Sequence, residues 1–361
     1  MNFRRGVAML CVVGASFAGE PPVAQQLRIE RLDPGFDALV APDAKLRIVA
    51  SGFGFIDTPL WIRGEHGRPG RLLASSIIDN VVYQVTQDGK VSVFLDQAGY
   101  SGNDFARDGK FASIGRMKVV LMGPGCVALD GQGRVVWCAG QDRAVMRREA
   151  DGSRTVLARD AAGKRFNGPN DVAIARDGAI YFSDSDVGLR GGIDGGLAEM
   201  PNAVWRWKDG VVTQVVSREQ LGAEPNGIAL SPDDRWLYLS AGTMSADPKL
   251  MRYALKSDGS VEAGTTFAHG AGIGDGMRTD RAGNLWSTQP VPGVVRVTAP
   301  DGTLLGLIHL PTFGDQEPRK TACASSLAFG GDDARTLYVA ACERIYALPL
   351  QTAGRLEGPA H

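Results

Sequence analysis

A short motif that recurs six times limits what this chain can fold into more than any other feature. Its clearest copy, at residues 168–175, ends in a short apolar run and is followed by a tight Asp-Gly turn and a second run rich in aromatic and β-branched residues. Such a pattern is typical of a β-hairpin. The six copies lie about 45 to 70 residues apart, at residues 57–62, 123–129, 168–175, 224–231, 274–280 and 323–329. This repeat predicts an array of small sheets.

One position, just before the first apolar run, is shared by all six copies, and we call it the slot. The slots hold Asp57, Gly125, Asn170, Asn226, Asp275 and Ser325. Four of these six residues carry a carboxylate or a carboxamide, where a purely structural turn would more often use Gly or Pro. If the sheets are arranged around an axis, these side chains converge on it and form a site.

A second hairpin completes each repeat. Asp-Gly turns between alternating apolar runs recur at residues 88–89, 151–152, 209–210, 258–259 and 301–302. Two hairpins make a four-stranded unit, so residues 45–361 predict an all-β fold, a six-bladed β-propeller of four-stranded antiparallel blades. Because a propeller must close, we expect a strand from the N-terminal segment to complete the last blade.

The N-terminus has the pattern of an export signal. Arg4 and Arg5 precede a mostly apolar stretch from residue 6 to 17, and small residues occur near Ala18. We therefore expect a signal peptide at 1–18, a flexible segment at 19–44, and a periplasmic or secreted protein. The apolar stretch is too short for an ordinary membrane-spanning helix, so no membrane insertion is expected after cleavage. The formal net charge of −1 gives no reason to expect binding to nucleic acid.

Four cysteines remain after the signal. Cys126 with Cys138, and Cys323 with Cys342, each flank one predicted hairpin. In an oxidising compartment each pair could form a cross-strand disulfide, and four buried free thiols are an equal alternative. The absence of closely paired cysteines argues against a thiolate metal site.

The slots favour oxygen-ligand chemistry. Asp57, Asn170, Asn226 and Asp275 offer two carboxylates and two amides, which suit one hard divalent cation, most simply Ca²⁺, with Mg²⁺, Mn²⁺ or Zn²⁺ as alternatives. Asp275, between two glycines, is the candidate general base. The alternative is that these residues only cap turns.

Candidate substrate-binding residues lie just before the third slot. Arg165 can bind a polar or anionic group, and Asn167 follows it. A Ser/His/Asp mechanism has little support, because no Gly-x-Ser-x-Gly motif is present.

Several of these runs resemble one known family. Residues 165–171, 181–184, 225–229, 275–277 with 283–286, and 327–331 are similar to the senescence-marker protein/regucalcin–gluconolactonase family of six-bladed propeller lactonases. The resemblance covers roughly residues 45–350. It implies an axial divalent cation, usually calcium, hydrolysis of lactones, and roles as metal ligands for Asn170, Asn226 and Asp275, with Asp275 as base. The family has Glu-Gly-Pro at the first slot, where this chain has Asp57-Thr58-Pro59, and Asn or Ser where it has Gly125.

The leading hypothesis is thus an exported, metal-dependent lactonase acting on a small-molecule cyclic ester. Three alternatives remain: a non-catalytic propeller whose cation only stabilises the axis, a metal-independent propeller that binds a small molecule, and a hydrolase of other substrates such as organophosphates. The sequence does not indicate an oligomeric state.

Overall fold

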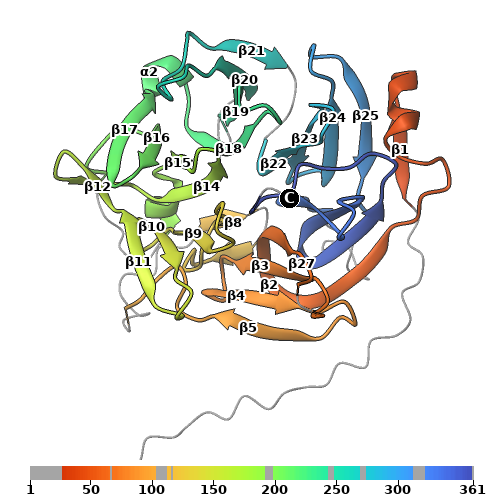
Figure 1. Cartoon of the computed structure of the whole chain (residues 1–361), viewed down its shortest axis with the longest axis horizontal. Coiled ribbons are helices and arrows are strands. Elements are labelled where there is room, and N and C mark those ends of the chain that lie inside the picture. Colours follow the sequence, from red (N-terminus) through yellow and green to blue (C-terminus); the bar gives the residue numbers. More distant parts are fainter. Residues whose placement is uncertain are drawn as a thin grey trace, which may run out of the picture.

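The strands of this protein surround a central axis, as Figure 1 shows. The computed structural model describes residues 27–65, 67–102, 112–114, 117–191, 198–242, 248–268, 274–311 and 322–359. Nearly all regular elements within these ranges are β-strands, and the large sheets are antiparallel. The predicted all-β propeller of four-stranded antiparallel blades is confirmed.

Four sheets each contain one repeat, with their strands following one another outward from the axis. The first sheet contains β8 (Val127–Leu129), β9 (Val135–Ala139), β10 (Ala144–Arg148) and β11 (Arg154–Ala158). The second contains β14 (Pro169–Ile174), β15 (Ile180–Asp184), β16 (Ala203–Lys208) and β17 (Val211–Val216). The third contains β18 (Pro225–Leu230), β19 (Trp236–Ala241), β20 (Lys249–Ala254) and β21 (Thr265–Ala268). The fourth contains β22 (Met277–Thr279), β23 (Leu285–Gln289), β24 (Val294–Thr298) and β25 (Leu304–His309).

A fifth sheet joins the two ends of the chain. Its strands are β26 (Ser326–Gly330), β27 (Thr336–Pro349), β2 (Arg47–Ile62), β3 (Arg71–Ser76), β4 (Val81–Val85) and β5 (Val91–Leu95). The first part of β2 pairs with β27 and its second part pairs with β3, so the first and last repeats share one sheet. The predicted closure by an N-terminal strand is therefore confirmed, and five large sheets are present where we expected six separate blades.

The innermost strands nevertheless follow one another in a closed ring. Along it, β2, β8, β14, β18, β22 and β26 each contact the next, and β26 contacts β2. Apolar clusters fill the space between neighbouring sheets. Trp286 of β23, for example, packs edge-on against Phe329 of β26 with ring centroids 5.7 Å apart. These inter-sheet cores hold the inner strands in place around the axis.

The N-terminal segment is more ordered than expected. β1 (Arg28–Arg31) adds a fifth strand to the fourth sheet by pairing with β25, and the 3₁₀-helix η1 (Pro34–Ala38) buries Phe36 completely. Glu30 Oε1 also lies 2.9 Å from Nε2 of His309. Residues 27–44 therefore belong to the folded ring, which corrects the flexible segment predicted for 19–44. The predicted signal peptide lies outside the described residues.

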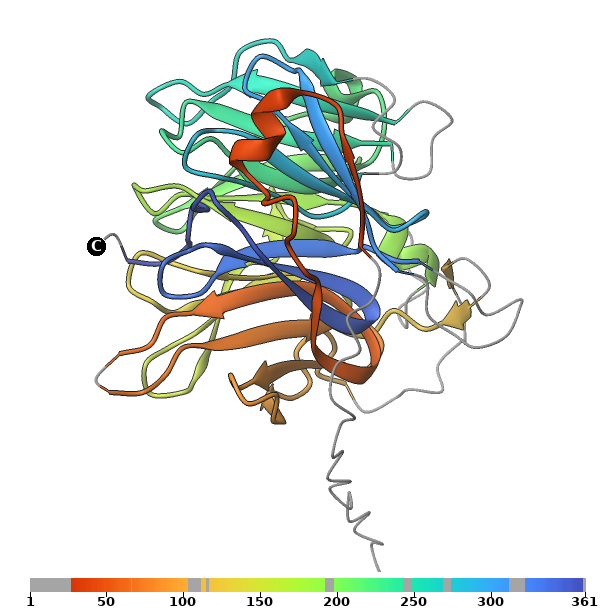
Figure 2. The same ribbon diagram turned by 90° about the vertical axis from the view of Figure 1, so that its right-hand side faces the viewer.

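The two faces of the ring differ. We call the face where the inner strands begin the slot face. Because Asp184 pairs with Pro169, β15 ends at this face, and α1 (Val187–Gly191) follows it. α1 contacts β6 (Ala112–Ile114), which pairs with β7 (Met117–Val119). The C-terminal end lies on the opposite side of the ring from α1 in Figure 2.

The remaining elements are short. β12 (Asp160–Ala161) pairs with β13 (Lys164–Arg165) just before the third repeat. α2 (Arg218–Leu221) begins at a Ser217–Gln220 capping box and links two sheets. Among the described residues, no helix is long and apolar enough to cross a membrane.

Both cysteine pairs are disulfides. Cys126–Cys138 and Cys323–Cys342 have Cα–Cα distances of 5.0 and 5.8 Å. Of the two alternatives that the sequence left open, disulfides are therefore the observed one. Cys126 directly follows the second slot, and Cys323 lies two residues before the sixth, so each bond ties the start of an inner strand to a neighbouring strand.

Candidate functional site

The slot positions lie side by side around the axis. Ser325 Oγ donates a hydrogen bond to the carbonyl oxygen of Ile56, next to the first slot, at 2.8 Å. Thr58 Oγ1 donates to the carbonyl oxygen of Gly125 at 3.0 Å. A Cβ on Gly125 would lie 2.7 Å from the carbonyl oxygen of Asn170. The first, second, third and sixth slots are thus in direct succession.

The other side of the ring is equally close. A Cβ on Gly227, beside the fourth slot, would lie only 1.9 Å from the carbonyl oxygen of Asp275. A Cβ on Gly276 would lie 1.9 Å from Ser326 Oγ, beside the sixth slot. Only glycine fits such backbone approaches. The predicted convergence of the slots on the axis is therefore present in the structure.

A local irregularity in strand pairing surrounds the first, third and fourth slots. The pairing of β14 with β15 shifts between Pro169 and Val172, and that of β18 with β19 shifts between Pro225 and Ile228. A similar shift occurs in β2 between Ile56 and Pro59, around the first slot. Such bulges leave residues outside the regular ladder and redirect their side chains. The recurring polar residue before each apolar run is the sequence sign of this feature.

Two carboxyl groups interact near the axis, in the region between the inner strands that we call the axial channel. Burial, and then the charges of Asp275 and Asp171, raise the pKa of Asp57 well above its ordinary value. Burial and the charge of Asp171 raise the pKa of Asp275 to about 8, although a hydrogen bond with Asn226 opposes this shift. Asp57 and Asp275 keep partial solvent access. They form a partly accessible carboxyl pair whose raised pKa values show that nearby positive charge, including that of Arg278 on Asp57, does not offset burial and the neighbouring carboxylates.

Sequence reasoning missed an ion network behind this pair. Asp171, one residue after the third slot, is buried and lies 3.6 Å from Nη1 of Arg278. Arg278 is also buried, and its Nε lies 3.0 Å from Glu357 near the C-terminus. Asp171 was part of a recognised motif, but nothing in the local pattern linked it to a C-terminal residue.

The opposite charges of this network stabilise one another, with Arg278 between Asp171 and Glu357. Although burial opposes it, the pKa of Arg278 is raised by Asp171 and Glu357, so the guanidinium stays charged. Its Nη2 is buried and has no hydrogen-bond partner among the described residues. A buried donor of this kind usually bonds to an ordered water or a ligand oxygen.

The two predicted substrate-binding residues differ in their surroundings. Arg165 is exposed, and its Nη2 donates to the carbonyl oxygen of Asp142 at 3.4 Å. Asn167 is fully buried, and its Nδ2 donates to the carbonyl oxygen of Met200 at 3.0 Å and to Asn202 at 3.2 Å. Asn167 therefore supports the segment after α1, and its contact with a substrate stays a prediction.

The family of this chain follows from comparison with known proteins. A family model described as SMP-30/Gluconolactonase/LRE-like region matches residues 59–343. The chain belongs to this family. A gluconolactonase from Zymomonas mobilis subsp. mobilis is 31% identical over 340 residues, which cover 91% of this chain and 87% of that protein. The resemblance inferred from the motifs is confirmed.

Solved structures of the family agree with the fold. A gluconolactonase structure from Xanthomonas campestris has a TM-score of 0.73 and 29% identity, and it covers 92% of this chain and 98% of that one. A calcium-binding regucalcin from Agrobacterium tumefaciens has a TM-score of 0.63 at 17% identity, covering 87% and 96% of the two chains. The latter likeness concerns the fold alone.

The donor atoms of the slot residues determine whether a cation could bind at the axis. Within the parts of the chain that the structure describes, no three carboxylate, imidazole or thiolate groups gather as a metal cluster. The channel instead combines the carboxyls of Asp57 and Asp275 with the amide of Asn226, which bonds to Asp275. Two interacting carboxyls with raised pKa values need a counter-charge, and oxygen donors suit a hard cation. The chemistry of this donor set fits such an ion.

Proposed function

We propose that this protein is an exported, six-bladed lactonase that opens a cyclic ester at the slot face with one divalent cation, most simply Ca²⁺. The family and the gluconolactonase relative support lactone hydrolysis as the reaction. A 6-deoxy-6-sulfogluconolactonase from Pseudomonas putida is also 40% identical, over 32% of this chain and 36% of that protein. The proposed substrate is accordingly a small lactone.

One observation carries the proposal: the partly accessible carboxyls of Asp57 and Asp275 interact near the axis, and Asn226 is hydrogen-bonded to Asp275. These residues, with Asn170, are the proposed ligands. A divalent cation bound there would polarise the carbonyl oxygen of the lactone. Because bound cations also favour the ionised form of nearby acids, both carboxyls would be charged in the loaded enzyme.

Three residues of the chain then have separate roles in the proposed reaction. The carboxylate of Asp275 accepts a proton from a water molecule, whose oxygen bonds to the carbonyl carbon. The ring C–O bond breaks, and the same proton passes to the leaving ring oxygen, which gives a hydroxy acid. The hydrogen bond from Asn226 orients the base. Arg165, exposed in β13 just before the third repeat, is proposed to contact the polar substituents of the ring.

Export is a separate part of the proposal. It rests on the basic and apolar pattern of the first 18 residues, and the two disulfides support it because such bonds persist in oxidising compartments. Intact-mass measurement of the protein recovered from the periplasm or medium tests it. A mass that matches cleavage near Ala18 is expected, and an uncleaved chain retained in the cytoplasm would contradict it.

The substitution Asp275→Asn tests the reaction. It keeps the size of the side chain but removes the base, so kcat should fall by about a thousandfold. The control is Asp301→Asn, because Asp301 is an exposed turn residue that accepts a hydrogen bond from Thr303 N at 2.9 Å. The control should keep full turnover, and both variants should keep the circular dichroism of the wild type. A fully active Asp275→Asn variant would refute the assignment.

A further inference from the structure

The last residues of the chain cross the face opposite the slots. We call residues 350–359 the C-terminal strap. Backbone hydrogen bonds join it to the turn after β26 and to the end of β22, where Arg355 N donates to the carbonyl oxygen of Thr279 at 3.1 Å. At the end of β8, Leu129 N donates to Glu357 Oε2 at 3.2 Å. The strap therefore reaches inner strands on different sides of the axis.

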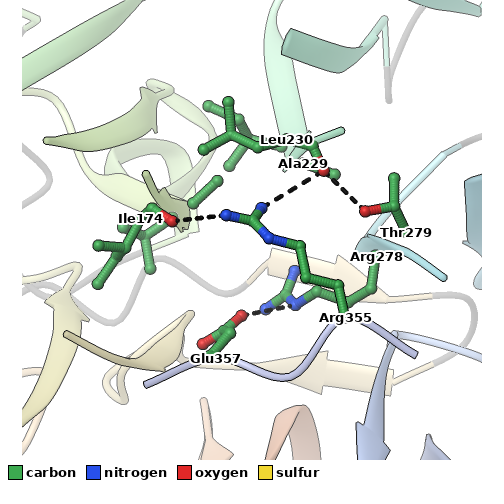
Figure 3. A pocket seen from close by; sticks show the side chains of 10 residues that line it. Ile174, Ala229, Leu230, Arg278, Thr279, Arg355 and Glu357 are labelled. Carbon is green, nitrogen blue, oxygen red and sulfur yellow. Dashed lines mark hydrogen bonds and ion pairs between the residues drawn. The ribbon is translucent and has the colours of Figure 1, made fainter. Parts of the chain in front are cut away.

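Arg355 fastens the strap to the ends of two further inner strands. Its Nη2 donates to the carbonyl oxygen of Ile174 at 3.2 Å, and its Nη1 donates to that of Leu230 at 3.5 Å, as Figure 3 shows. The same guanidinium bonds to Asp234 at 2.8 Å. Arg355 is thus an anchor that ties the strap to the ends of inner strands on the face opposite the slots.

Glu357 reaches the charged network of the site. Its Oε1 accepts a hydrogen bond from Nε of Arg278, and Figure 3 shows the two side chains pointing toward each other. Arg278 Nη1 donates to the carbonyl oxygen of Met277 at 2.7 Å and lies 3.6 Å from Asp171. One guanidinium therefore connects the strap to the carboxylates of the channel.

We propose that Glu357 is a positioning residue of the axial site. Its carboxylate fixes Arg278 against Asp171 and balances the charge of that guanidinium behind the slot carboxyls. This inference rests on the proposed function, because the slots are the candidate cation site. It assigns a role in cation affinity to a residue that lies outside every repeat and on the opposite face.

The physical basis is a balance of charges. A cation at the slots is attracted by Asp57, Asp275 and Asp171 and repelled by Arg278. If Glu357 loses its charge, Arg278 remains buried with one fewer compensating anion. The net charge around the cation site then becomes more positive by one elementary charge, and a divalent ion is bound less tightly. Charge interactions in a partly buried channel are strong enough for about a tenfold loss of affinity.

The test compares two strap variants, Glu357→Gln and Arg355→Gln. Ca²⁺ is titrated calorimetrically into chelator-treated protein, and lactone turnover and thermal midpoint are measured on the same samples. Glu357→Gln should weaken Ca²⁺ binding about tenfold. Arg355→Gln also removes strap contacts, but it removes a positive charge, so Ca²⁺ affinity should stay equal to the wild type or increase.

The two variants are expected to differ in Ca²⁺ affinity, and this difference distinguishes a positioning role for Glu357 from a merely structural role of the strap. If both variants weaken Ca²⁺ binding equally, together with a loss of thermal stability, the strap only holds the fold and the proposal is overturned. Unchanged Ca²⁺ affinity in Glu357→Gln would overturn it as well. Exchange of the Arg278 Nε–H with solvent, followed by NMR, should be slow in wild type and fast in Glu357→Gln.

Failure of the cation site itself would look different. If wild-type protein binds no Ca²⁺ but hydrolyses lactones, the proposed function loses its cation, and the positioning role is judged by turnover. Glu357→Gln should then lower kcat at unchanged KM, while Arg355→Gln should not. Equal kcat values for wild type and Glu357→Gln would overturn the positioning role. If wild type neither binds Ca²⁺ nor turns over lactones, both proposals are refuted.

Discussion

Asp57 and Asp275 interact electrostatically in the axial channel, although they come from the first and fifth repeats of the chain. Each occupies the slot of its repeat. The charge of Asp275 disfavours the ionised form of Asp57, the charge of Asp171 disfavours the ionised forms of both groups, and each has a raised pKa. An arrangement that disfavours its own charge in the absence of a ligand is typical of a binding or catalytic site.

The pH dependence of stability should reveal this pair. In the cation-free folded protein Asp275 has a pKa of about 8, against an ordinary 3.8, so the folded state binds this proton more tightly than the unfolded state. The resulting stabilisation is complete below about pH 4 and is lost as the pH rises through about 8. Thermal melts in chelator should therefore show a lower midpoint at pH 8.5 than at pH 6.

Asp275→Asn is the control for this effect, because it removes the titrating group at nearly constant volume. The decrease in midpoint between pH 6 and pH 8.5 should become smaller in this variant. Saturating Ca²⁺ should also reduce the decrease in wild type, since the cation favours the ionised carboxyls. A midpoint that rises over this pH range in chelator would show that the pair does not carry a raised pKa.

Gly125 should be intolerant of even a methyl group. A Cβ there would lie 2.7 Å from the carbonyl oxygen of Asn170, so the backbone of the third slot must move. Gly125→Ala should cost about 1 to 3 kcal/mol of unfolding free energy and weaken Ca²⁺ binding. Gly131→Ala is the matched control, because no atom lies within 4 Å of a Cβ at that position. Urea unfolding and calcium titration of both variants test this, and equal behaviour would contradict the close packing of the slots.

The disulfide next to the second slot should contribute measurably to stability. Cys126 and Cys138 are 12 residues apart, and a loop of this size corresponds to about 3 kcal/mol in the chain-entropy account. The double variant Cys126→Ala/Cys138→Ala should lose about that amount in guanidinium unfolding. The comparison is Cys323→Ala/Cys342→Ala, whose separation of 19 residues predicts a similar loss. Wild-type stability in both double variants would show that the bonds do not form in solution.

The repeats made the architecture and the slots predictable, because each blade is a local hairpin pattern and every slot has the same position in it. The merging of the first and last repeats into one sheet was not predictable in this way. It depends on β2 and β27 each continuing through two pairings. The order in residues 27–44 was also missed, since the burial of Phe36 depends on contacts with the fourth sheet and the end of the chain.

The ion network was beyond local patterns for the same reason. Arg278 reads as one charged residue in a short inner strand, and Glu357 as one in a polar tail. Their pairing exists only because the strap returns across the ring after the last blade. Side chains that meet through the closure of a fold leave no periodic sign in the sequence.

The most direct measurement is lactone hydrolysis by the mature protein, across a small panel of ring sizes and substituents. Each assay is run on the protein as purified, after thorough chelation, and after Ca²⁺ or Mn²⁺ is restored. We predict turnover that disappears on chelation and returns with the cation. Turnover unchanged by thorough chelation would contradict the cation mechanism, and no turnover in any condition would contradict the assignment as a lactonase.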